Sequence, residues 1–397
     1  MARKRKQVNI ALIGQGFMGR THSNAWTQVR RFFDPPVEPV MHTVFGQAEE
    51  NPEQFAHRWG WDNVTTDWKK LVKSDEIDLV DVVTPNFAHA PVAKAALQAG
   101  KPVLCEKPLA GTLADARQMV QAAKRAKVPN VVGFNYRRCP AVALAHELVR
   151  GGKIGQVRHV RAWYLQDWAD ESVPLMWRFD KKLAGSGAHG DLNAHIVDMT
   201  RFVTGEEITD ICGAIAETFI KERKLMSGVA AGGISEGVKS SARKGKVTVD
   251  DTVLFLARFS GGAVASFEAA RQATGNKNKN GWEINGTKGS IRFNFERMNE
   301  LEYFDATGPA AATQGWSTIL ATEGDHPYAG AWWPPGHVLG YEHGFTHQAY
   351  DVLKVLAGQK PTVPLVDFAD AFKTQCILEA ALKSATGKRP VKVSTVK

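Results

Sequence analysis

Short apolar runs alternate with amphipathic segments along the first third of the chain. Each apolar run is long enough for one strand, and the segments between them repeat apolar positions at helical spacing. Regular alternation of strand and helix is typical of an α/β domain with a parallel, doubly wound sheet. The pattern predicts strands at residues 8–14, 40–45, 77–83, 102–105 and 130–134, and helices at 17–33, 52–59, 89–98 and 113–127.

After residue 155 the pattern changes, because strand-like segments now follow one another with few helices between them. This order predicts a C-terminal α+β domain with a large, mostly antiparallel, open sheet. Residues 221–246, rich in glycine, serine and lysine, are expected to form a mobile loop, and residues 306–341 show no periodicity. We expect strands at 157–165, 208–219, 252–259, 263–269 and 290–295, and helices at 189–203, 343–356 and 366–385.

Chain length supports this division. At 397 residues the chain exceeds the size at which a single core stops growing, so two domains are expected. We place the boundary between residues 136 and 137, and expect the last two helices to pack back on the first domain. The composition, 44% hydrophobic and 23% charged, is that of an ordinary globular protein.

Charge and cysteine usage exclude several classes of protein. The formal net charge is +9, but the basic residues are scattered, and the one dense run, at residues 3–6, is interpreted as a solvated terminus. We therefore expect no nucleic-acid partner. The four cysteines stand far apart without a C-x-x-C pair, so neither a metal site nor a disulfide framework is predicted, and a cytoplasmic location is favoured. No run is long enough to cross a membrane.

A glycine motif follows the first predicted strand. Gly14, Gly16 and Gly19 have the spacing G-x-G-x-x-G and stand directly before a predicted helix. Such glycines permit a tight turn and close approach of a dinucleotide pyrophosphate, which the helix N-terminus then binds. By itself the motif is weak, but its position in a strand–helix series favours dinucleotide binding over a plain turn.

The acidic residue that usually follows the second strand is missing. A carboxylate there would bind the ribose 2′-hydroxyl and repel a 2′-phosphate. The sequence has Gly46 and Gln47 instead, with Glu49 and Glu50 slightly later and no arginine. NAD is favoured, and NADP stays open.

Three residues have the chemistry of alcohol oxidation. Lys107 follows the strand at 102–105, at the sheet edge where doubly wound folds bind ligands. Asp191 and His195 are spaced i, i+4 in a predicted helix and share one face, which also suits an ordinary helix salt bridge. Histidine is a suitable base for the hydroxyl proton, and lysine stabilises a developing alkoxide.

These residues together resemble the Gfo/Idh/MocA family, named after glucose-fructose oxidoreductase and inositol dehydrogenase. The glycine turn, Thr84-Pro85-Asn86 with His89, Glu106-Lys107-Pro108, and Asp191 through His195 occur in that family's order. The resemblance implies a Rossmann domain at 1–136 and a substrate-binding and oligomerisation domain at 137–397. It also implies a homodimer or homotetramer, and a sugar or cyclitol substrate.

The resemblance assigns roles to individual residues. It implies a catalytic set of Lys107, Asp191 and His195, with His195 as base. The expected cofactor contacts are Gly14, Gly16, Phe17, Met18, Gly19, Thr84, Pro85, Asn86, His89, Glu106 and Lys107. The expected substrate contacts are Tyr136, Gln166, Asp167, Trp168, Asp191, Asn193 and His195.

The sequence leaves other readings open. The 331–337 segment is expected either to cover the pocket or to form a subunit contact, and Trp177 and Arg178 suit packing as well as binding. The leading hypothesis is an NAD(P)-dependent dehydrogenase that oxidises a ring hydroxyl of a sugar, anhydrosugar, glycoside or cyclitol. One alternative is a glycoside hydrolase or lyase that retains NAD and oxidises its substrate transiently. The other is a non-catalytic dinucleotide sensor that regulates a partner.

Overall fold

The computed structural model describes residues 5–226, 240–308 and 311–396. Its N-terminal part is a six-stranded sheet in the order β3-β2-β1-β4-β5-β6, with every neighbouring pair parallel. The predicted parallel sheet is confirmed. The strands are β1 (Gln7–Ile13), β2 (Glu38–Phe45), β3 (Asn63–Thr65), β4 (Leu79–Val82), β5 (Val103–Cys105) and β6 (Asn130–Val132).

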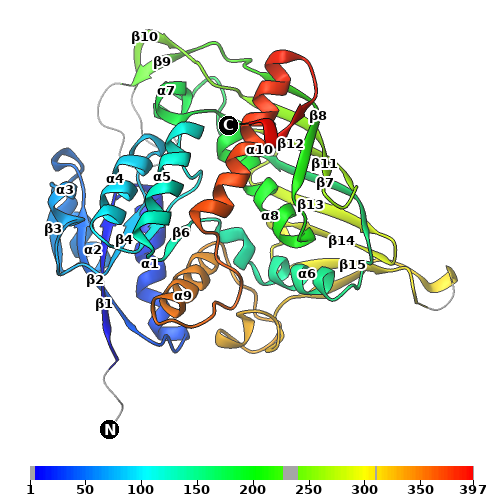
Figure 1. Ribbon diagram of the computed structural model, residues 1–397, viewed down its shortest axis with the longest axis horizontal. Helices are drawn as coiled ribbons and strands as arrows, with labels where there is room; N and C mark the ends of the chain where they lie inside the picture. The colour runs from blue at the N-terminus through cyan, green and yellow to red at the C-terminus, as the bar shows by residue number, and fades with distance from the viewer. Residues whose placement is uncertain (1–4, 227–239, 309–310, 397) are drawn as a thin grey trace.

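The central strand β1 shows why apolar runs form this sheet. Ile10 and Leu12 belong to one buried cluster, whereas Ala11 and Ile13 belong to the other. Successive side chains of a strand point to opposite faces, so both faces need apolar residues where helices cover them. The helices of this part, on the left of Figure 1, are α1 (Phe17–Phe32), α2 (Pro52–Trp59), α3 (Trp68–Leu71), α4 (Asn86–Gln98) and α5 (Leu113–Ala126).

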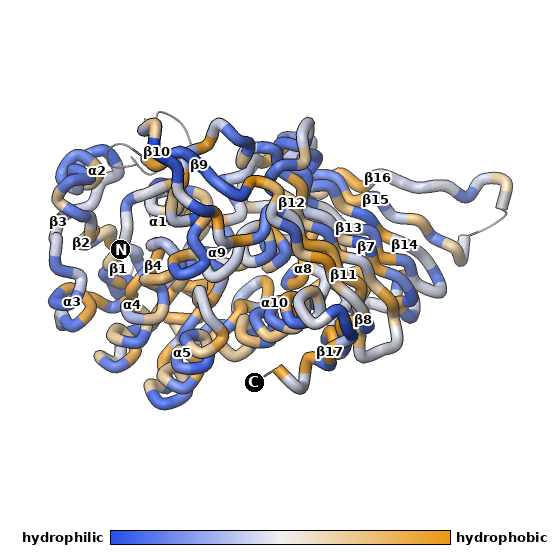
Figure 2. Tube along the Cα trace, turned by 90° about the horizontal axis from the view of Figure 1, so that it is seen from above, coloured by the Kyte–Doolittle hydropathy of each residue, from blue (hydrophilic) through white to orange (hydrophobic). Residues whose placement is uncertain are grey.

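The C-terminal part contains a nine-stranded sheet in the order β16-β15-β14-β13-β7-β12-β11-β8-β17. Its neighbouring strands are antiparallel except β7 and β12, so the predicted mostly antiparallel sheet is confirmed. Figure 2 shows these strands side by side, with hydrophobic and hydrophilic residues mixed along them. They are β7 (Val157–Leu165), β8 (Ile208–Glu217), β11 (Thr252–Phe259), β12 (Val264–Ala270), β13 (Lys279–Gly286), β14 (Gly289–Asn294), β15 (Glu300–Asp305), β16 (Ser317–Leu320) and β17 (Val391–Lys392).

Strand β13 was not predicted, although it pairs with β7 and β14 inside the sheet. Its sequence has only two large apolar residues, Trp282 and Ile284, and both are fully buried. Two alternating apolar positions are too few for a strand signal, and only pairing on both sides makes this segment a strand.

The predicted mobile loop at 221–246 is wrong at both of its ends. Strands β9 (Glu222–Met226) and β10 (Ser240–Lys246) form an antiparallel pair, while residues 227–239 lie outside the described part. Contacts of Arg223 explain why β9 is an ordered strand. The buried Arg223 guanidinium stacks 4.0 Å from the Phe179 ring centroid and donates to the carbonyl oxygens of Ala169 and Val173. Such tertiary contacts leave no local sequence signal.

Most of the remaining helices contact strands of the large sheet, whereas one lies against α4 and one returns to α1. Helix α9 packs on α1, and α10 contacts both α5 and α8, which places α10 in the middle of the molecule in Figure 1. Among the described helices, none is long and apolar enough to cross a bilayer. The helices that follow α5 are α6 (Pro140–Arg150), α7 (Lys181–Ala184), α8 (Ala194–Thr204), α9 (His343–Leu356) and α10 (Phe368–Gly387).

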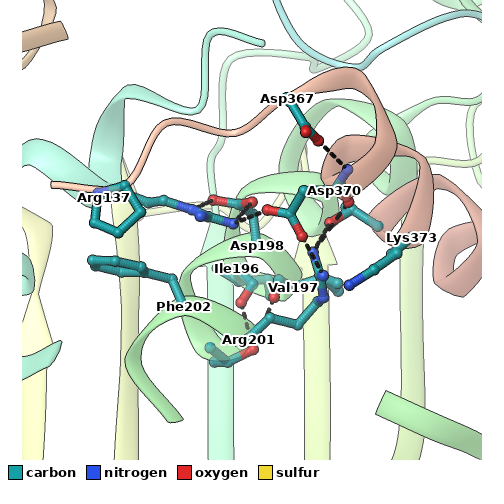
Figure 3. Close-up of polar contacts among 12 residues, drawn as sticks. Arg137, Ile196, Val197, Asp198, Arg201, Phe202, Asp367, Asp370 and Lys373 are labelled. Carbon is teal, nitrogen blue, oxygen red and sulfur yellow. Dashed lines mark hydrogen bonds and ion pairs between the residues drawn. The ribbon is translucent and has the colours of Figure 1, made fainter. Parts of the chain in front are cut away.

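A buried ion-pair network joins α8, α10 and the short turn η2 (Asn135–Arg138) (Figure 3). The Arg137 guanidinium donates to both carboxylate oxygens of Asp198, at 2.7 and 2.6 Å. Asp370 of α10 lies between Arg137 and Arg201 and accepts from each, at 3.0 and 2.6 Å. The network therefore connects α8 to the C-terminal helix α10.

Candidate functional site

A cavity of about 830 Å³ opens at the carboxyl edge of the parallel sheet. It is bounded by the glycine turn, by the turns after β4 and β5, by the start of α8 and by the end of β7. The residues that line it and were predicted as site residues are Gly14, Gly16, Phe17, Met18, Thr84, Pro85, Asn86, Glu106, Lys107, Tyr136, Gln166, Trp168, Asp191 and His195.

The glycine turn has the geometry that its sequence predicts. Gly14 has φ +115°, and a Cβ there would lie 3.2 Å from the Val83 backbone. A Cβ on Gly19 would lie 2.7 Å from the Gly14 carbonyl oxygen, so glycine is required for close packing of the turn. No side chain caps the start of α1 at Gly16. Its first N–H groups are therefore available to an anion, and the turn fits a dinucleotide pyrophosphate.

His89 lies beneath the cavity rather than in its lining. Its two ring nitrogens lie 2.9 Å from the Pro108 carbonyl oxygen and 3.0 Å from that of Thr84. Burial lowers the pKa of His89 below its usual value. His89 thus joins the turn after β4 to the turn after β5.

Glu106 is held by a residue that the sequence analysis did not identify. His22 Nε2 lies 3.1 Å from Glu106 Oε1, and His22 Nδ1 lies 3.0 Å from Asp81. Burial opposes a charge on His22, but Asp81 and Glu106 outweigh it and raise the pKa of His22 to about 10. The second Glu106 oxygen accepts the Lys107 N–H at 3.2 Å. His22 lies in α1, Asp81 in β4 and Glu106 directly after β5. No local sequence pattern connects these three residues.

Lys107 and Asp191 form an ion pair inside the cavity. Lys107 Nζ lies 3.0 Å from Asp191 Oδ1, while Arg178 and Arg271 approach Oδ2 at 3.8 and 3.7 Å. Burial disfavours the carboxylate, but Lys107, Arg178 and Arg271 hold the pKa of Asp191 well below its usual range. Asp191 is therefore ionised, and Arg271 is a site residue that sequence reasoning missed.

His195 lies beside this pair, among aromatic rings. Its ring centroid is 4.5 Å from that of Tyr136 and 5.8 Å from that of Tyr164. Burial, and then the Lys107 charge, lower the pKa of His195 well below 6.5, against a smaller opposite effect of Asp191. Its Nδ1 is buried and has no hydrogen-bond partner among the described residues. The imidazole is thus neutral at physiological pH, which is the form in which a histidine can act as a base.

The helix expected at 189–203 begins differently from an ideal α-helix. Residues His189–Asn193 form a π-helical turn, η4, and α8 continues from Ala194. Such turns widen the helix and occur frequently at functional sites. Asp191 on this turn and His195 on α8 both line the cavity.

Polar side chains form the wall opposite the parallel sheet. Tyr136 and Tyr164 share a hydroxyl–hydroxyl hydrogen bond of 2.9 Å. Tyr164 and Gln166 both donate to Asn278 Oδ1, at 2.8 and 2.7 Å, and Trp168 Nε1 donates to Gln166 Oε1 at 2.9 Å. Asn278 also lines the cavity and was not predicted.

Two predicted substrate residues do not line the cavity. Asp167 pairs with Lys277 at 2.9 Å, and Asn193 is fully buried, with its amide 2.9 Å from His189 Nδ1. Of the segments left open, Trp177 and Arg178 line the cavity, whereas Trp332 of the 331–337 segment is buried and donates to His347.

Comparison with known proteins agrees with this arrangement. Residues 8–134 match the oxidoreductase family with an NAD-binding Rossmann fold, and residues 142–292 match the Gfo/Idh/MocA C-terminal domain. Levoglucosan dehydrogenase of Pseudarthrobacter phenanthrenivorans is 42% identical over 98% of this chain and 99% of its own length.

Solved structures have the same fold over the whole chain. An oxidoreductase domain protein from Kribbella flavida superposes with a TM-score of 0.90 at 48% identity, covering 98% of this chain and 99% of that one. A levoglucosan dehydrogenase in complex with NADH and levoglucosan superposes with a TM-score of 0.89 at 39% identity, covering 98% and 100%. The chain therefore belongs to the Gfo/Idh/MocA family of oxidoreductases with an NAD-binding Rossmann fold.

Proposed function

We propose that this protein is a sugar dehydrogenase that oxidises a ring hydroxyl with NAD. The observation that carries the proposal is one cavity that contains the glycine turn, the Lys107–Asp191 ion pair and the neutral imidazole of His195. Oxidation of a secondary alcohol requires a hydride acceptor, a proton acceptor and a stabilising charge near the oxygen. NAD, when bound, supplies the hydride acceptor, and this chain supplies the other two.

The chain's own residues divide the proton chemistry between them. His195 accepts the hydroxyl proton on an imidazole that burial and Lys107 keep neutral. Lys107 stabilises the developing negative charge on the substrate oxygen, and Asp191 orients the Lys107 ammonium. Arg178 and Arg271 in turn keep Asp191 ionised.

The substrate class follows from the opposite wall of the cavity and from the relatives. Tyr136 and Trp168 present ring surface to the carbon atoms of a sugar, and Gln166 and Asn278 present amides to its hydroxyls. Because levoglucosan dehydrogenases are similar over the full length, we favour an anhydrosugar or a related pyranose.

Subunit association is a separate part of the proposal. Ile215, Leu254 and Leu256 are exposed on one face of the large sheet. Contiguous exposed apolar residues mark association surfaces, and we propose that this face forms a homodimer or homotetramer.

Spectrophotometric assay of NADH formation tests the proposed activity. Levoglucosan, L-sorbose, D-glucose and myo-inositol are each offered with NAD, and at least one is expected to reduce it. A His195→Ala variant should lose at least about 100-fold in kcat. Glycoside cleavage without net NADH would instead identify an NAD-retaining hydrolase, and tight NAD binding with no turnover of any sugar would identify a sensor.

A further inference from the structure

The cavity wall opposite the parallel sheet carries a chain of hydrogen bonds that begins at a group with only one possible role. Trp168 Nε1 donates to Gln166 Oε1 at 2.9 Å, and an indole N–H can donate but cannot accept. The Gln166 atom that faces the indole must therefore be the carbonyl oxygen. The contact with Trp168 thus determines the orientation of the Gln166 amide, which the shape of the amide alone does not determine.

The orientation of Gln166 in turn determines that of Asn278. Gln166 Nε2 lies 2.7 Å from the Asn278 amide, and because Nε2 only donates, the Asn278 atom at this contact must be Oδ1. Tyr164 Oη lies 2.8 Å from the same oxygen and donates to it. Asn278 Oδ1 thus accepts two hydrogen bonds, which use both of its lone pairs.

The same reasoning extends to the second tyrosine of this wall. Tyr164 gives its one hydrogen to Asn278, so the 2.9 Å bond between the two tyrosine hydroxyls must use the hydrogen of Tyr136. Burial raises the pKa of Tyr136 to about 12 and the pKa of Tyr164 well above its usual value, so both hydroxyls keep their hydrogens near neutral pH. The two tyrosines therefore have no hydrogen to donate to a sugar.

The free donors of this wall are amide N–H groups. Asn278 Nδ2 donates to no described residue, and one hydrogen of Gln166 Nε2 is likewise unused among the described residues. Both residues line the cavity. His195, in contrast, has a neutral imidazole that accepts the hydrogen of the reacting hydroxyl in the proposed reaction. The cavity therefore offers donors at Asn278 and an acceptor at His195.

We propose that Trp168 is a specificity-determining residue, because its indole N–H makes the wall at Gln166 and Asn278 a hydrogen-bond donor. The sugar oxygen that faces Asn278 then binds through its lone pairs and needs no hydrogen of its own. An ether oxygen therefore serves there as well as a hydroxyl, whereas a group that can only donate is rejected. The inference rests on the proposed function for the sugar ligand, but not for its oxidation.

Calorimetric titration of the NADH-loaded protein with levoglucosan tests the donor wall, because NADH cannot accept a hydride and the sugar binds without being oxidised. Asn278→Asp keeps an acceptor for Tyr164 and Gln166 but replaces the free N–H group with an oxygen. It should weaken levoglucosan binding at least about 10-fold, because a donor is lost and two acceptors then face each other. If Oδ1 faced the sugar instead, the same substitution would leave binding unchanged or tighten it, and either result would overturn the proposal.

Asn276→Asp is the matched control, because it adds the same charge to the same loop at a residue that does not line the cavity. It should change the dissociation constant of levoglucosan by less than about 2-fold, since solvent screens a charge outside the cavity. An equal loss in Asn276→Asp and Asn278→Asp would show that charge, and not the missing N–H group, weakens binding, and would overturn the proposal.

A double-mutant cycle tests the role of Trp168 itself. Trp168→Phe keeps a ring in the wall but removes the N–H group, so the amides of Gln166 and Asn278 are free to turn. In this background, Asn278→Asp should weaken levoglucosan binding at least about 3-fold less than it does in the wild type. Trp168 and Asn278 are joined only through the hydrogen bonds of Gln166, so additive effects would contradict the assignment.

The remaining outcomes separate this inference from the proposed function. If Trp168→Phe fails to fold by circular dichroism, Asn278→Asp and its control decide. Absence of levoglucosan binding to the NADH-loaded wild type would overturn the inference. Binding with the expected pattern, but without NADH formation from any sugar, would contradict the proposed function and leave the inference intact.

Discussion

Lys107 Nζ lies 3.0 Å from Asp191 Oδ1 and 2.9 Å from the carbonyl oxygen of the same residue. The contact joins the carboxyl edge of the parallel sheet to the π-helical turn before α8. The side chain of a residue that follows β5 thus contacts the turn from which the helix of His195 continues. It brings a cation, a carboxylate and a neutral imidazole into one cavity.

Removal of the Lys107 cation should mainly affect the chemical step. We expect Lys107→Met to lower kcat at least about 100-fold, because the charge that stabilises the alkoxide is lost. NADH binding should change much less, since the glycine turn is intact. Steady-state kinetics and NADH titration measure the two effects. Lys124→Met, on the exposed face of α5, is the control, and an equal loss in both variants would contradict the assignment.

The pKa of His195 should move in opposite directions when its two charged neighbours are removed. Lys107 lowers this pKa and Asp191 raises it, so Lys107→Met should raise it and Asp191→Asn should lower it further. NMR titration of the histidine side chains without cofactor measures both shifts. In the wild type, His195 stays neutral at pH 7 and gains a proton only as the pH falls well below 6.5. If the pKa of His195 shifted in the same direction in both variants, the charges of Lys107 and Asp191 would not be what determines it.

His22 should make stability depend on pH above neutrality. Its pKa is about 10 in the folded protein and about 6.5 when unfolded, so its contribution is complete below pH 6.5 and is lost as the pH rises toward 10. The slope is at most about 1.4 kcal/mol per pH unit. Asp81→Asn removes a carboxylate that raises this pKa and should give a shallower slope in urea unfolding between pH 7 and 9. Equal slopes would exclude His22 as the source.

The buried network of Figure 3 should contribute strongly to stability through Asp198. Arg137→Met leaves the Asp198 carboxylate, which is 1% exposed, without its bidentate partner. We expect a loss of about 3–5 kcal/mol in the free energy of unfolding. Arg30→Met breaks the exposed pair with Glu38 and should cost less than about 1 kcal/mol. Similar losses in both variants would contradict the dependence on burial.

Substrate recognition should depend on Gln166 and not on its neighbour. Gln166→Leu removes the amide that donates to Asn278 and accepts from Trp168, so the sugar KM should rise about 10-fold with a smaller change in kcat. Asp167→Asn loses only the charge of a pair with Lys277 and should leave KM unchanged. Initial-rate kinetics over a range of sugar concentrations distinguish the two, and a larger effect of Asp167→Asn would restore the sequence prediction for that residue.

The sequence by itself determined the architecture and the glycine turn. Continuous apolar runs such as β1 and amphipathic helices such as α5 are local patterns, and local patterns report which segments bury apolar side chains. Gly14 and Gly19 can likewise be predicted from sequence, because the requirement for glycine comes from the turn itself. Gly14 has a positive φ, and a Cβ on Gly19 would lie 2.7 Å from the Gly14 carbonyl oxygen.

Only the tertiary structure decided which polar side chains meet. Gln166 and Asp167 are neighbours in sequence and follow β7, yet their side chains have different partners. Asp167 accepts from Lys277, whereas Gln166 donates to Asn278. His22, Asp81 and Arg271 carry no motif, and each acquires its role from a partner far away in the chain. Hydrophobic burial is specified position by position along the chain, whereas an ion pair or a shifted pKa depends on the distance between atoms of separate elements.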